Sequence, residues 1–398
     1  MDLLINPSKL KGNLSVIPSK SQAHRLLICA AFADKPTVLY CEDTNRDIEA
    51  TAACLNAIGA SIQRTKIGYK ISPVKDVVKK ATLPCRDSGS TLRFLLPVVG
   101  ALGIDATFQM EGRLSKRPLS PLWEEMERMG CTLSYVDDSY LHCCGNLCSG
   151  EYRIDGSVSS QFITGLLFAA ALIPGESRIT ITGKIESRPY IDMTRNAMEI
   201  FGRTSDNFIV FGGTPFISPS EQKVEGDWSN GAFLLAANAL GNDVVVENLS
   251  STSLQGDKAA ADLIVKLKEH CTICAADIPD LVPILSVVAA CNKGAVFTNI
   301  QRLRLKESDR VESVITMLRG LGGNAEATED TLTVYGTGLI GGNVDSVNDH
   351  RIAMSTAIAA TACREHVILH GAQCVEKSYP RFFEEYRRLG GNYEQYLR

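Results

Sequence analysis

The chain has 398 residues, of which 45% are hydrophobic and 22% are charged. These values are typical of a folded globular protein and exclude a disordered or collagen-like chain. The length predicts two domains, each large enough for its own core. Lys and Arg total 41 and Asp and Glu total 45, which leaves a net charge of −4. Nucleic-acid-binding proteins are usually basic, so this class is disfavoured.

The N-terminal segment Met1–Pro7 is too short and too acidic for a secretory signal, and it lacks the arginines of a transit peptide. The most apolar runs, Leu166–Pro174 and Leu281–Cys291, are far shorter than the ~20 residues that a membrane-spanning helix needs. Thirteen cysteines without a secretory signal indicate reduced thiols. We therefore expect a cytoplasmic protein without a membrane span.

One pattern recurs along the chain, an amphipathic helix that ends in an apolar residue and a glycine. The glycines are Gly59, Gly130, Gly202, Gly322 and Gly390. A glycine suits the left-handed backbone that often follows the last turn of a helix. Several successive copies are about 70 residues apart, and Leu263–His270 is a degenerate copy in the remaining gap. The pattern predicts six repeated units, arranged as two domains of three.

Short β-rich runs lie between these helices. They are Thr82–Pro84, Tyr152–Ile154, Arg178–Thr182, Val244–Glu247 and Thr331–Tyr335. The alternation of strands and helices predicts an α/β (α+β) fold. Val224–Trp228 lies near the middle of the chain and is the expected crossover between the domains.

Two patterns point to other kinds of site. His142–Cys148 and His270–Cys274 are rich in metal-ligand residues, but only Cys271 and Cys274 have the spacing of a zinc knuckle. Gly336–Gly341 matches G-x-G-x-x-G, yet turn-rich residues follow it where a dinucleotide site needs a helix. We expect a glycine hairpin between two strands there, and neither a metal nor a nucleotide cofactor.

Four segments combine a turn of small residues with the start of a helix, and three of them carry cations. They are Pro18–Leu27, Asp87–Phe94, Asp155–Phe162 and Leu305–Arg310. The first turn of a helix presents unpaired N–H groups and a partial positive charge, which attract phosphate and carboxylate. Ser21 is expected to cap the first helix. An ordinary capped helix explains any one segment, but four such segments indicate anionic ligands.

The fourth of these segments contains closely spaced charges. Lys306 and Arg310 share a helix face if the helix starts early, and Glu307 can pair with Arg310. Two cations at a helix N-terminus oppose the helix dipole, and a bound anion would offset that cost. Asp280, directly before the apolar run Leu281–Ala290, is expected to be an N-cap or a base, and the two roles are compatible.

Ten short motifs occur in the order found in one known family. They are PSKSxxxR, SGSTxR, KRP, SSQ, SRPYIDMT, EGDWS, IPD, KESDR, NDHRIAM and KSYP, between Lys11 and Phe383. In these motifs the chain resembles the 5-enolpyruvylshikimate-3-phosphate synthase (3-phosphoshikimate 1-carboxyvinyltransferase) family. The resemblance implies two similar globular domains, each of three βαβαββ repeats (an inside-out α/β barrel), with the active site in the interdomain cleft. One domain would comprise residues 1–18 plus 227–398, and the other residues 19–226.

The resemblance also implies a reaction. The enolpyruvyl group of phosphoenolpyruvate moves to the 5-hydroxyl of shikimate 3-phosphate, and phosphate leaves, by addition and elimination through a tetrahedral intermediate. This step belongs to the shikimate pathway, which leads to chorismate and the aromatic amino acids. General acid–base catalysis and positioning suffice for it, so no cofactor and no metal are expected. The family further suggests a monomer.

The residues that the resemblance assigns fall into three overlapping groups. Those for shikimate 3-phosphate are Lys20, Ser21, Arg25, Ser159, Ser160, Gln161, Ser187, Tyr190, Asp280 and Lys306. Those for phosphoenolpyruvate are Lys20, Gly89, Arg93, Arg117, Gln161, Arg310, Arg351 and Lys377. The catalytic residues are Asp280 as the base for the 5-hydroxyl, and Glu307, with Lys20 or Lys377, for proton transfer at the enol methylene.

Two alternatives remain open at this point. UDP-N-acetylglucosamine enolpyruvyl transferase shares the implied fold and donor, but that family commonly carries a reactive cysteine in a mobile loop, and the corresponding segment Glu111–Ser120 has none. A repeat scaffold for protein partners would not need cations clustered at the starts of its helices. Asp87 and Ser90 stand where many members of the resembled family have Asn and Thr.

Overall fold

The computed structural model describes residues 1–396. Its chain forms two compact units. Unit 1 consists of Met1–Ile17 and the chain from Gly226 onward, and unit 2 is Pro18–Glu225. Each unit encloses its own cluster of buried hydrophobic side chains. The boundaries between the units lie one residue before the expected ones at 18/19 and 226/227.

The described part of unit 2 contains three sheets. One has the strand order β13 (Glu221–Lys223), β3 (Thr37–Tyr40), β5 (Gly68–Ser72), β4 (Ser61–Thr65). The next has the order β6 (Lys80–Arg86), β7 (Asp105–Met110), β9 (Tyr140–Gly145), β8 (Cys131–Asp137). The last has the order β10 (Glu151–Asp155), β11 (Gly175–Thr182), β12 (Ile209–Gly212).

Unit 1 also has three sheets among residues 1–396. One is the pair β14 (Asp243–Glu247) and β2 (Lys11–Ser15). The next has the order β15 (Cys271–Cys274), β16 (Ala295–Thr298), β18 (Thr331–Tyr335), β17 (Asn324–Ala327). The last has the order β19 (Gly342–Asp345), β20 (Val367–His370), β1 (Leu3–Asn6), β21 (Asn392–Gln395). The N-terminal strand therefore completes a sheet built from the C-terminal part of the chain.

The helices lie between these strands. Those of unit 2 are α1 (Lys20–Ala31), α2 (Arg46–Ala57), α3 (Gly89–Leu102), α4 (Leu122–Arg128), α5 (Ser160–Leu172) and α6 (Arg188–Ile200). Those of unit 1 are α7 (Trp228–Ala239), α8 (Ala260–Lys266), α9 (Val282–Cys291), α10 (Arg310–Gly320), α11 (His350–Ala360) and α12 (Phe382–Arg388). The five predicted glycines follow α2, α4, α6, α10 and α12 with positive φ angles, as expected.

Each of the six sheets contains one parallel pair of strands. The pairs are β13 with β3, β6 with β7, β10 with β11, β14 with β2, β15 with β16, and β19 with β20. Parallel neighbours require a crossover, and in four pairs a single helix supplies it: α3 for β6 and β7, α5 for β10 and β11, α9 for β15 and β16, and α11 for β19 and β20. The segments β6–β9 and β15–β18 both run β-α-β-α-β-β and have the same strand order within their sheets. The six sheets confirm the predicted α/β fold of six repeated units.

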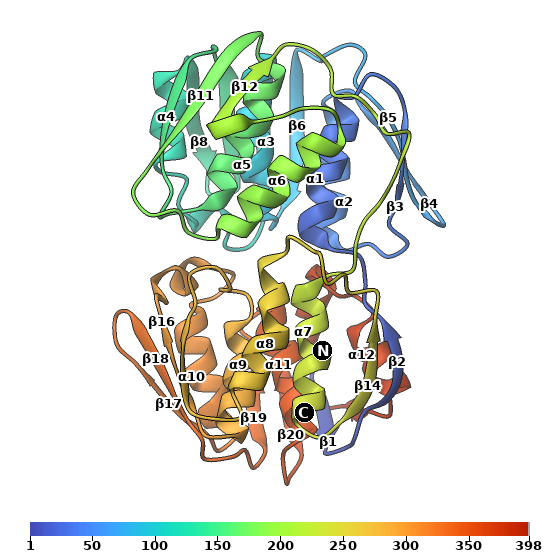
Figure 1. Cartoon of the computed structure of the whole chain (residues 1–398), viewed down its shortest axis with the longest axis vertical. Helices are drawn as coiled ribbons and strands as arrows, with labels where there is room; N and C mark the ends of the chain where they lie inside the picture. The colour runs from blue at the N-terminus through green and yellow to red at the C-terminus, as the bar shows by residue number, and fades with distance from the viewer. Residues whose placement is uncertain (397–398) are drawn as a thin grey trace. The chain divides into compact units, whose positions relative to one another are not determined.

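Several helices are buried on every side. Every residue from Phe162 to Ala171 of α5 and from Val282 to Ala290 of α9 is buried. A helix that is apolar all round belongs in a core and not at a surface. Figure 1 shows such helices inside each unit and strands at its outside. The core helices of each unit therefore lie inside and its sheets lie outside, and several of the predicted site residues lie at helix N-termini.

The structure shows what the glycine-rich segment Gly336–Gly341 and the pair Cys271 and Cys274 form. Gly336–Gly341 follows β18, but β18 pairs with β16 and β17 whereas β19 pairs with β20. The predicted hairpin is therefore wrong, because the segment links two different sheets. Cys271 and Cys274 begin and end β15. An odd spacing along a strand places side chains on opposite faces, so these two thiols do not form a knuckle.

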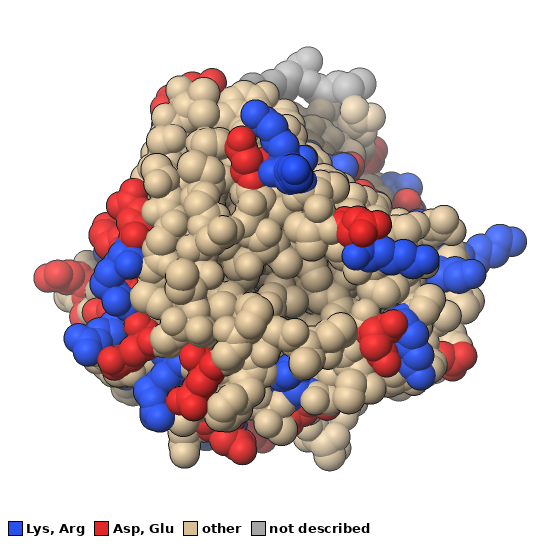
Figure 2. Space-filling view, turned by 90° about the horizontal axis from the view of Figure 1, so that it is seen from above, with Lys and Arg blue, Asp and Glu red and all other residues tan. Residues whose placement is uncertain are grey.

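The surface charge is mixed. On the face shown in Figure 2, Lys and Arg side chains lie beside Asp and Glu around the rim, and uncharged residues form the centre. This arrangement agrees with the small net charge of the chain. Among residues 1–396, no helix has both the length and the apolar character that crossing a membrane requires.

Candidate active site

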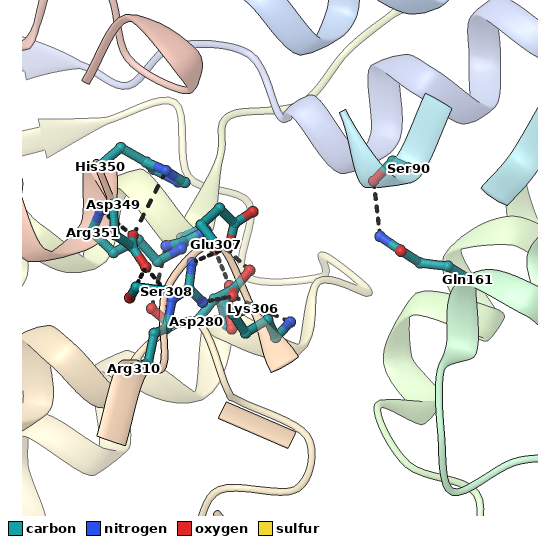
Figure 3. Close-up of polar contacts among 12 residues, drawn as sticks. Ser90, Gln161, Asp280, Lys306, Glu307, Ser308, Arg310, Asp349, His350 and Arg351 are labelled. Carbon is teal, nitrogen blue, oxygen red and sulfur yellow. Dashed lines mark hydrogen bonds and ion pairs between the residues drawn. The ribbon is translucent and has the colours of Figure 1, made fainter. Parts of the chain in front are cut away.

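Asp280 lies at the centre of a cluster of charges in unit 1 (Figure 3). Its Oδ1 is 2.5 Å from Arg310 Nη1 and 3.6 Å from Lys306 Nζ, and its Oδ2 is 3.1 Å from Arg351 Nη2. Leu281, and not Asp280, occupies the N-cap position of α9. The expectation that Asp280 caps this helix is therefore wrong. Its carboxylate instead binds cations from other elements.

Arg310 is the first residue of α10, and its side chain is only 1% exposed. Its guanidinium contacts three carboxylates. Nη1 meets Asp280, Nη2 lies 2.7 Å from Glu307 Oε2, and Nε lies 2.8 Å from Asp349 Oδ2. Asp349 also caps α11, because its Oδ1 accepts the Arg351 N–H at 2.9 Å. The planar fork of arginine suits this arrangement, since it aims separate donors at separate acceptors.

Lys306 and Arg310 do not share a helix face. The helix α10 begins only at Arg310, because Asp309 caps it by accepting the N–H groups of Val311 and Glu312. Lys306 follows the short 3-10 helix η4 (Gln301–Leu305). The expectation of an early helix start is wrong, and the two cations meet through their common partner Asp280. The predicted pairing of Glu307 with Arg310 is confirmed.

The electrostatics of this cluster follow from its burial and its opposite charges. Burial raises the pKa of Asp280, but Arg351, Lys306 and Arg310 outweigh it and hold that pKa well below its usual range. Burial lowers the pKa of Lys306 to about 8, although Asp280 opposes the shift. Burial also disfavours the charged form of Arg310, but Asp349, Glu307 and Asp280 raise its pKa well above the ordinary value. Carboxylates therefore compensate the cations at the start of α10.

Lys20 is the first residue of α1 in unit 2, and its Nζ lies 2.9 Å from Asp47 Oδ2. Asp47 is buried in the first turn of α2. Ser19 caps α1 by accepting the Gln22 N–H, so the predicted cap at Ser21 is wrong. The reason is local, because Ser19 has the extended backbone of a cap whereas Ser21 is already helical.

A close crossing of α3 and α5 aligns two of the predicted site residues. A Cβ atom on Gly165 would lie 2.3 Å from the carbonyl oxygen of Arg93, so only glycine permits this approach. One turn before Gly165, Gln161 reaches the side chain of Arg93, whose Nη1 donates to Gln161 Oε1 at 2.9 Å. Gln161 Nε2 in turn donates to Ser90 Oγ at 3.0 Å (Figure 3). The crossing therefore fixes a cation and an amide beside the start of α3.

Two guanidinium groups converge on Gly89, the first residue of α3. A Cβ atom at this position would lie 2.7 Å from Arg117 Nη1 and 3.1 Å from Arg93 Nη1. Ser88 caps the helix by accepting the Thr91 N–H. The two guanidinium groups repel one another and the positive end of the helix. An anion bound there would be attracted by both arginines and by the helix N-terminus.

Arg25 is buried among helices. Its Nε donates to Thr194 Oγ1 at 2.8 Å, Nη1 to the Ser21 carbonyl oxygen at 2.6 Å, and Nη2 to the Tyr190 carbonyl oxygen at 2.8 Å. Burial lowers its pKa to about 10, which leaves it cationic at neutral pH. Arg25 thereby ties α1 to α6 and fixes the backbone at two other predicted residues.

The remaining predicted residues occupy ends of helices. Ser159 caps α5, whose first two residues are Ser160 and Gln161, and Ser187 is the N-cap residue of α6 with a φ of 54°. Lys377 is buried at the end of the 3-10 helix η5 (Ala372–Lys377) in unit 1. The structure thus assembles one group of predicted residues in unit 2 and another in unit 1.

Several residues of these groups were not predicted from the sequence. Asp47 binds Lys20, Asp349 binds Arg310, and Ser229 accepts a hydrogen bond from Arg351. These partners lie 27, 39 and 122 positions apart in the chain. Asp349 and Ser229 do fall within the motifs NDHRIAM and EGDWS, which were the only signals that could have identified them.

Comparisons with known proteins agree on one family. The family model described as EPSP synthase (3-phosphoshikimate 1-carboxyvinyltransferase) matches residues 5–274 and 266–386. A 3-phosphoshikimate 1-carboxyvinyltransferase of Clostridium perfringens (strain ATCC 13124) is 40% identical over 418 residues, which cover 98% of each chain. The protein of the same name from Clostridium kluyveri is 38% identical over 420 residues, again with 98% of each chain covered.

Solved structures share the fold. An EPSP synthase from Acinetobacter baumannii superimposes with a TM-score of 0.81 at 23% identity, and 99% of each chain is covered. The enolpyruvyl transferase NikO from Streptomyces tendae has a TM-score of 0.79 at 15% identity, with 99% of this chain and 98% of that one covered. At these identities the likeness is one of fold.

Proposed function

The chain belongs to the EPSP synthase (3-phosphoshikimate 1-carboxyvinyltransferase) family, and we propose that it transfers the enolpyruvyl group of phosphoenolpyruvate to the 5-hydroxyl of shikimate 3-phosphate. One observation carries this proposal. Asp280 is an ionised carboxylate held by two buried arginines and a lysine, all of which are suited to bind substrate anions. An anionic substrate that draws those cations away would make Asp280 a stronger base.

Phosphoenolpyruvate carries a phosphate and a carboxylate, which call for several cations. We assign it to Lys20, Gly89, Arg93, Arg117 and Gln161 of unit 2 and to Arg310, Arg351 and Lys377 of unit 1. The convergence of Arg93 and Arg117 on the start of α3 supports this assignment. Arginine forks match phosphate and carboxylate geometry with paired hydrogen bonds.

Shikimate 3-phosphate offers a phosphate and several ring hydroxyls. We assign it to Lys20, Ser21, Arg25, Ser159, Ser160, Gln161, Ser187, Tyr190, Asp280 and Lys306. The starts of α1, α5 and α6 provide N–H groups and hydroxyls suited to its phosphate. Arg25 contributes by holding the backbone of Ser21 and Tyr190 and by adding positive charge.

The proposed reaction needs three proton movements. Glu307, with Lys20 or Lys377, delivers a proton to C3 of the enol, which gives C2 cationic character. Asp280 accepts the proton of the 5-hydroxyl as its oxygen attacks C2, and a tetrahedral intermediate forms. Glu307, with Lys20 or Lys377, then takes back a proton from C3 as phosphate departs with the C–O bonding electrons, and the double bond is restored. Binding of phosphoenolpyruvate by Arg310 and Arg351 weakens their hold on Asp280 and so raises its basicity.

An assay for the release of inorganic phosphate tests this function. The purified protein is incubated with phosphoenolpyruvate, with shikimate 3-phosphate, and with both, in the presence of a chelator. We expect release of inorganic phosphate only when both substrates are present. Turnover with UDP-N-acetylglucosamine in place of shikimate 3-phosphate would contradict the proposal and favour the related transferase.

The affinity for shikimate 3-phosphate should depend on the charge of Lys306. Because burial lowers the pKa of Lys306 to about 8, this side chain is a cation below that pH and neutral above it. We expect the dissociation constant for shikimate 3-phosphate to be nearly constant from about pH 7 to pH 7.5 and to increase by up to about tenfold per pH unit above pH 8. Isothermal titration calorimetry at successive pH values measures this dependence.

Lys306→Arg is the control for this measurement, because its guanidinium stays protonated throughout the range. Its dissociation constant should rise much less above pH 8. An equally steep rise in both proteins would show that another group causes the pH dependence.

Two further expectations belong to this proposal. Both groups of residues come from a single chain, so a monomer is sufficient for activity. All thirteen cysteines are free thiols, which suits the reducing environment of the cytoplasm.

A further inference from the structure

Arg351 has a second side-chain partner in addition to Asp280. Its Nη2 lies 3.1 Å from Asp280 Oδ2 and 3.2 Å from Ser229 Oγ. Arg351 is the second residue of α11 and Ser229 the second residue of α7, and both are buried. The guanidinium that we assign to phosphoenolpyruvate is therefore anchored to the start of a different helix.

The hydroxyl of Ser229 is itself oriented by a buried carboxylate. It donates its proton to Asp257 Oδ2, and Asp257 is 2% exposed in the 3-10 helix η3 (Gly256–Ala259). A serine hydroxyl has one proton and two lone pairs. Because the hydroxyl proton points to Asp257 in a hydrogen bond, a lone pair of Ser229 is left to accept a hydrogen bond from Arg351 Nη2.

The segment that carries Asp257 is fixed to the first turn of α7. Gln255 Oε1 accepts the Trp228 N–H at 3.0 Å, and Gln255 Nε2 donates to the Gly226 carbonyl oxygen at 2.8 Å. The Gln255 N–H in turn donates to Ser253 Oγ at 3.1 Å. These hydrogen bonds fix the position of Asp257 relative to Ser229.

Burying a carboxyl group near other carboxylates is unfavourable unless cations and hydrogen bonds compensate it. Burial raises the pKa of Asp257 to about 7, and repulsion from Asp280 acts in the same direction, while Arg351 opposes them. Asp227, the N-cap residue of α7, adds further repulsion. A purely structural hydrogen bond to Ser229 would not require a carboxyl group at this position.

We propose that Ser229 and Asp257 are positioning residues for enolpyruvyl transfer, which hold Arg351 in place when phosphoenolpyruvate replaces Asp280 as its partner. The inference rests on the proposed function and assigns these two residues an effect on one substrate. When Arg351 turns from Asp280 to the anionic substrate, the bond to Ser229 remains. The guanidinium then needs less reordering on binding, which favours affinity.

Ser229→Ala tests the role of the hydroxyl, and Ser355→Ala is its matched control. Ser355 is also buried and lies one turn after Arg351 on α11, and in residues 1–396 its hydroxyl makes no hydrogen bond. We expect Ser229→Ala to raise the KM for phosphoenolpyruvate about tenfold, as loss of one hydrogen bond to a charged group does. The KM for shikimate 3-phosphate and the melting temperature should stay near the values of the control.

Asp257→Asn tests the carboxylate with almost no change in volume. Alone it should raise the KM for phosphoenolpyruvate about threefold, and in the Ser229→Ala background it should have no further effect. Residues that act through one chain of contacts are non-additive in this way. A purely structural role would lower the melting temperature and affect both substrates alike.

The possible outcomes distinguish the two proposals. Wild-type protein without turnover of the two substrates would overturn the proposed function and this inference with it. If the wild type is active and Ser229→Ala matches Ser355→Ala in its KM for phosphoenolpyruvate, only the positioning role is overturned. Additive effects of Ser229→Ala and Asp257→Asn would remove Asp257 from that role.

Discussion

Replacing Asp280 by asparagine should lower kcat about a thousandfold, because the amide cannot accept the proton of the 5-hydroxyl. General bases contribute roughly 10²–10⁴-fold to rates. Asparagine keeps the size of the side chain and its hydrogen-bond acceptor, but it removes the negative charge that binds Arg310, Arg351 and Lys306. The KM for phosphoenolpyruvate should therefore stay the same or fall, since the substrate no longer competes with a carboxylate for the arginines.

Steady-state kinetics with each substrate varied in turn measure this effect. Asp262→Asn is the control, because Asp262 is an exposed carboxylate in the first turn of α8. The control should retain the wild-type kcat. An Asp280→Asn enzyme with the wild-type kcat would show that Asp280 is not the base. A large rise in its KM for phosphoenolpyruvate would contradict the idea that this substrate competes with Asp280 for Arg310 and Arg351.

Replacing Arg310 by methionine should destabilise the protein by about 3–5 kcal/mol. Such losses are typical when one partner of a buried ion pair is removed and its counter-charges remain. Methionine fills the space of the stem but leaves Asp280, Glu307 and Asp349 without the guanidinium that they share. Urea unfolding followed by circular dichroism measures the change in the free energy of unfolding.

The matched control is Arg381→Met, in which an arginine with a 54% exposed side chain loses its ion pair with Glu385. Exposed pairs contribute little, so the control should change stability by less than about 1 kcal/mol. Equal effects of the two substitutions would contradict the buried role of Arg310.

The pH dependence provides a second check on the same variant. In the wild type, Arg310 helps to keep the pKa values of Asp280 and Asp349 below their usual range, although burial alone would raise them. Lowered carboxyl pKa values stabilise the fold above the unfolded pKa, near 4, and this contribution is lost as the pH falls through the folded pKa. The loss of stability caused by Arg310→Met should therefore be nearly constant from about pH 7 to pH 5 and shrink as the pH is lowered from about 4 towards 2. A loss that does not shrink at low pH would point to packing as its cause.

The sequence predicted some local parts of the site correctly. The glycines that follow helices and the pairing of Glu307 with Arg310 depend on residues within one or two turns of each other. The wrong predictions at Ser21 and at the start of α10 were also local. Ser19, and not Ser21, has the extended backbone of a cap, and the cap at Asp309 makes α10 begin only at Arg310.

The family and its repeated α/β units could be read from the sequence because motif order and glycine spacing are properties of the chain alone. Which carboxylates compensate which cations could not. Asp349 reaches Arg310, Asp47 reaches Lys20, and Asp257 reaches Ser229 only after sheets and helices have packed. Burial then strengthens these ion pairs, because opposite charges attract one another more strongly in a low-dielectric interior than in water. Only the tertiary structure decided that the cations at the start of α10 are already matched by carboxylates.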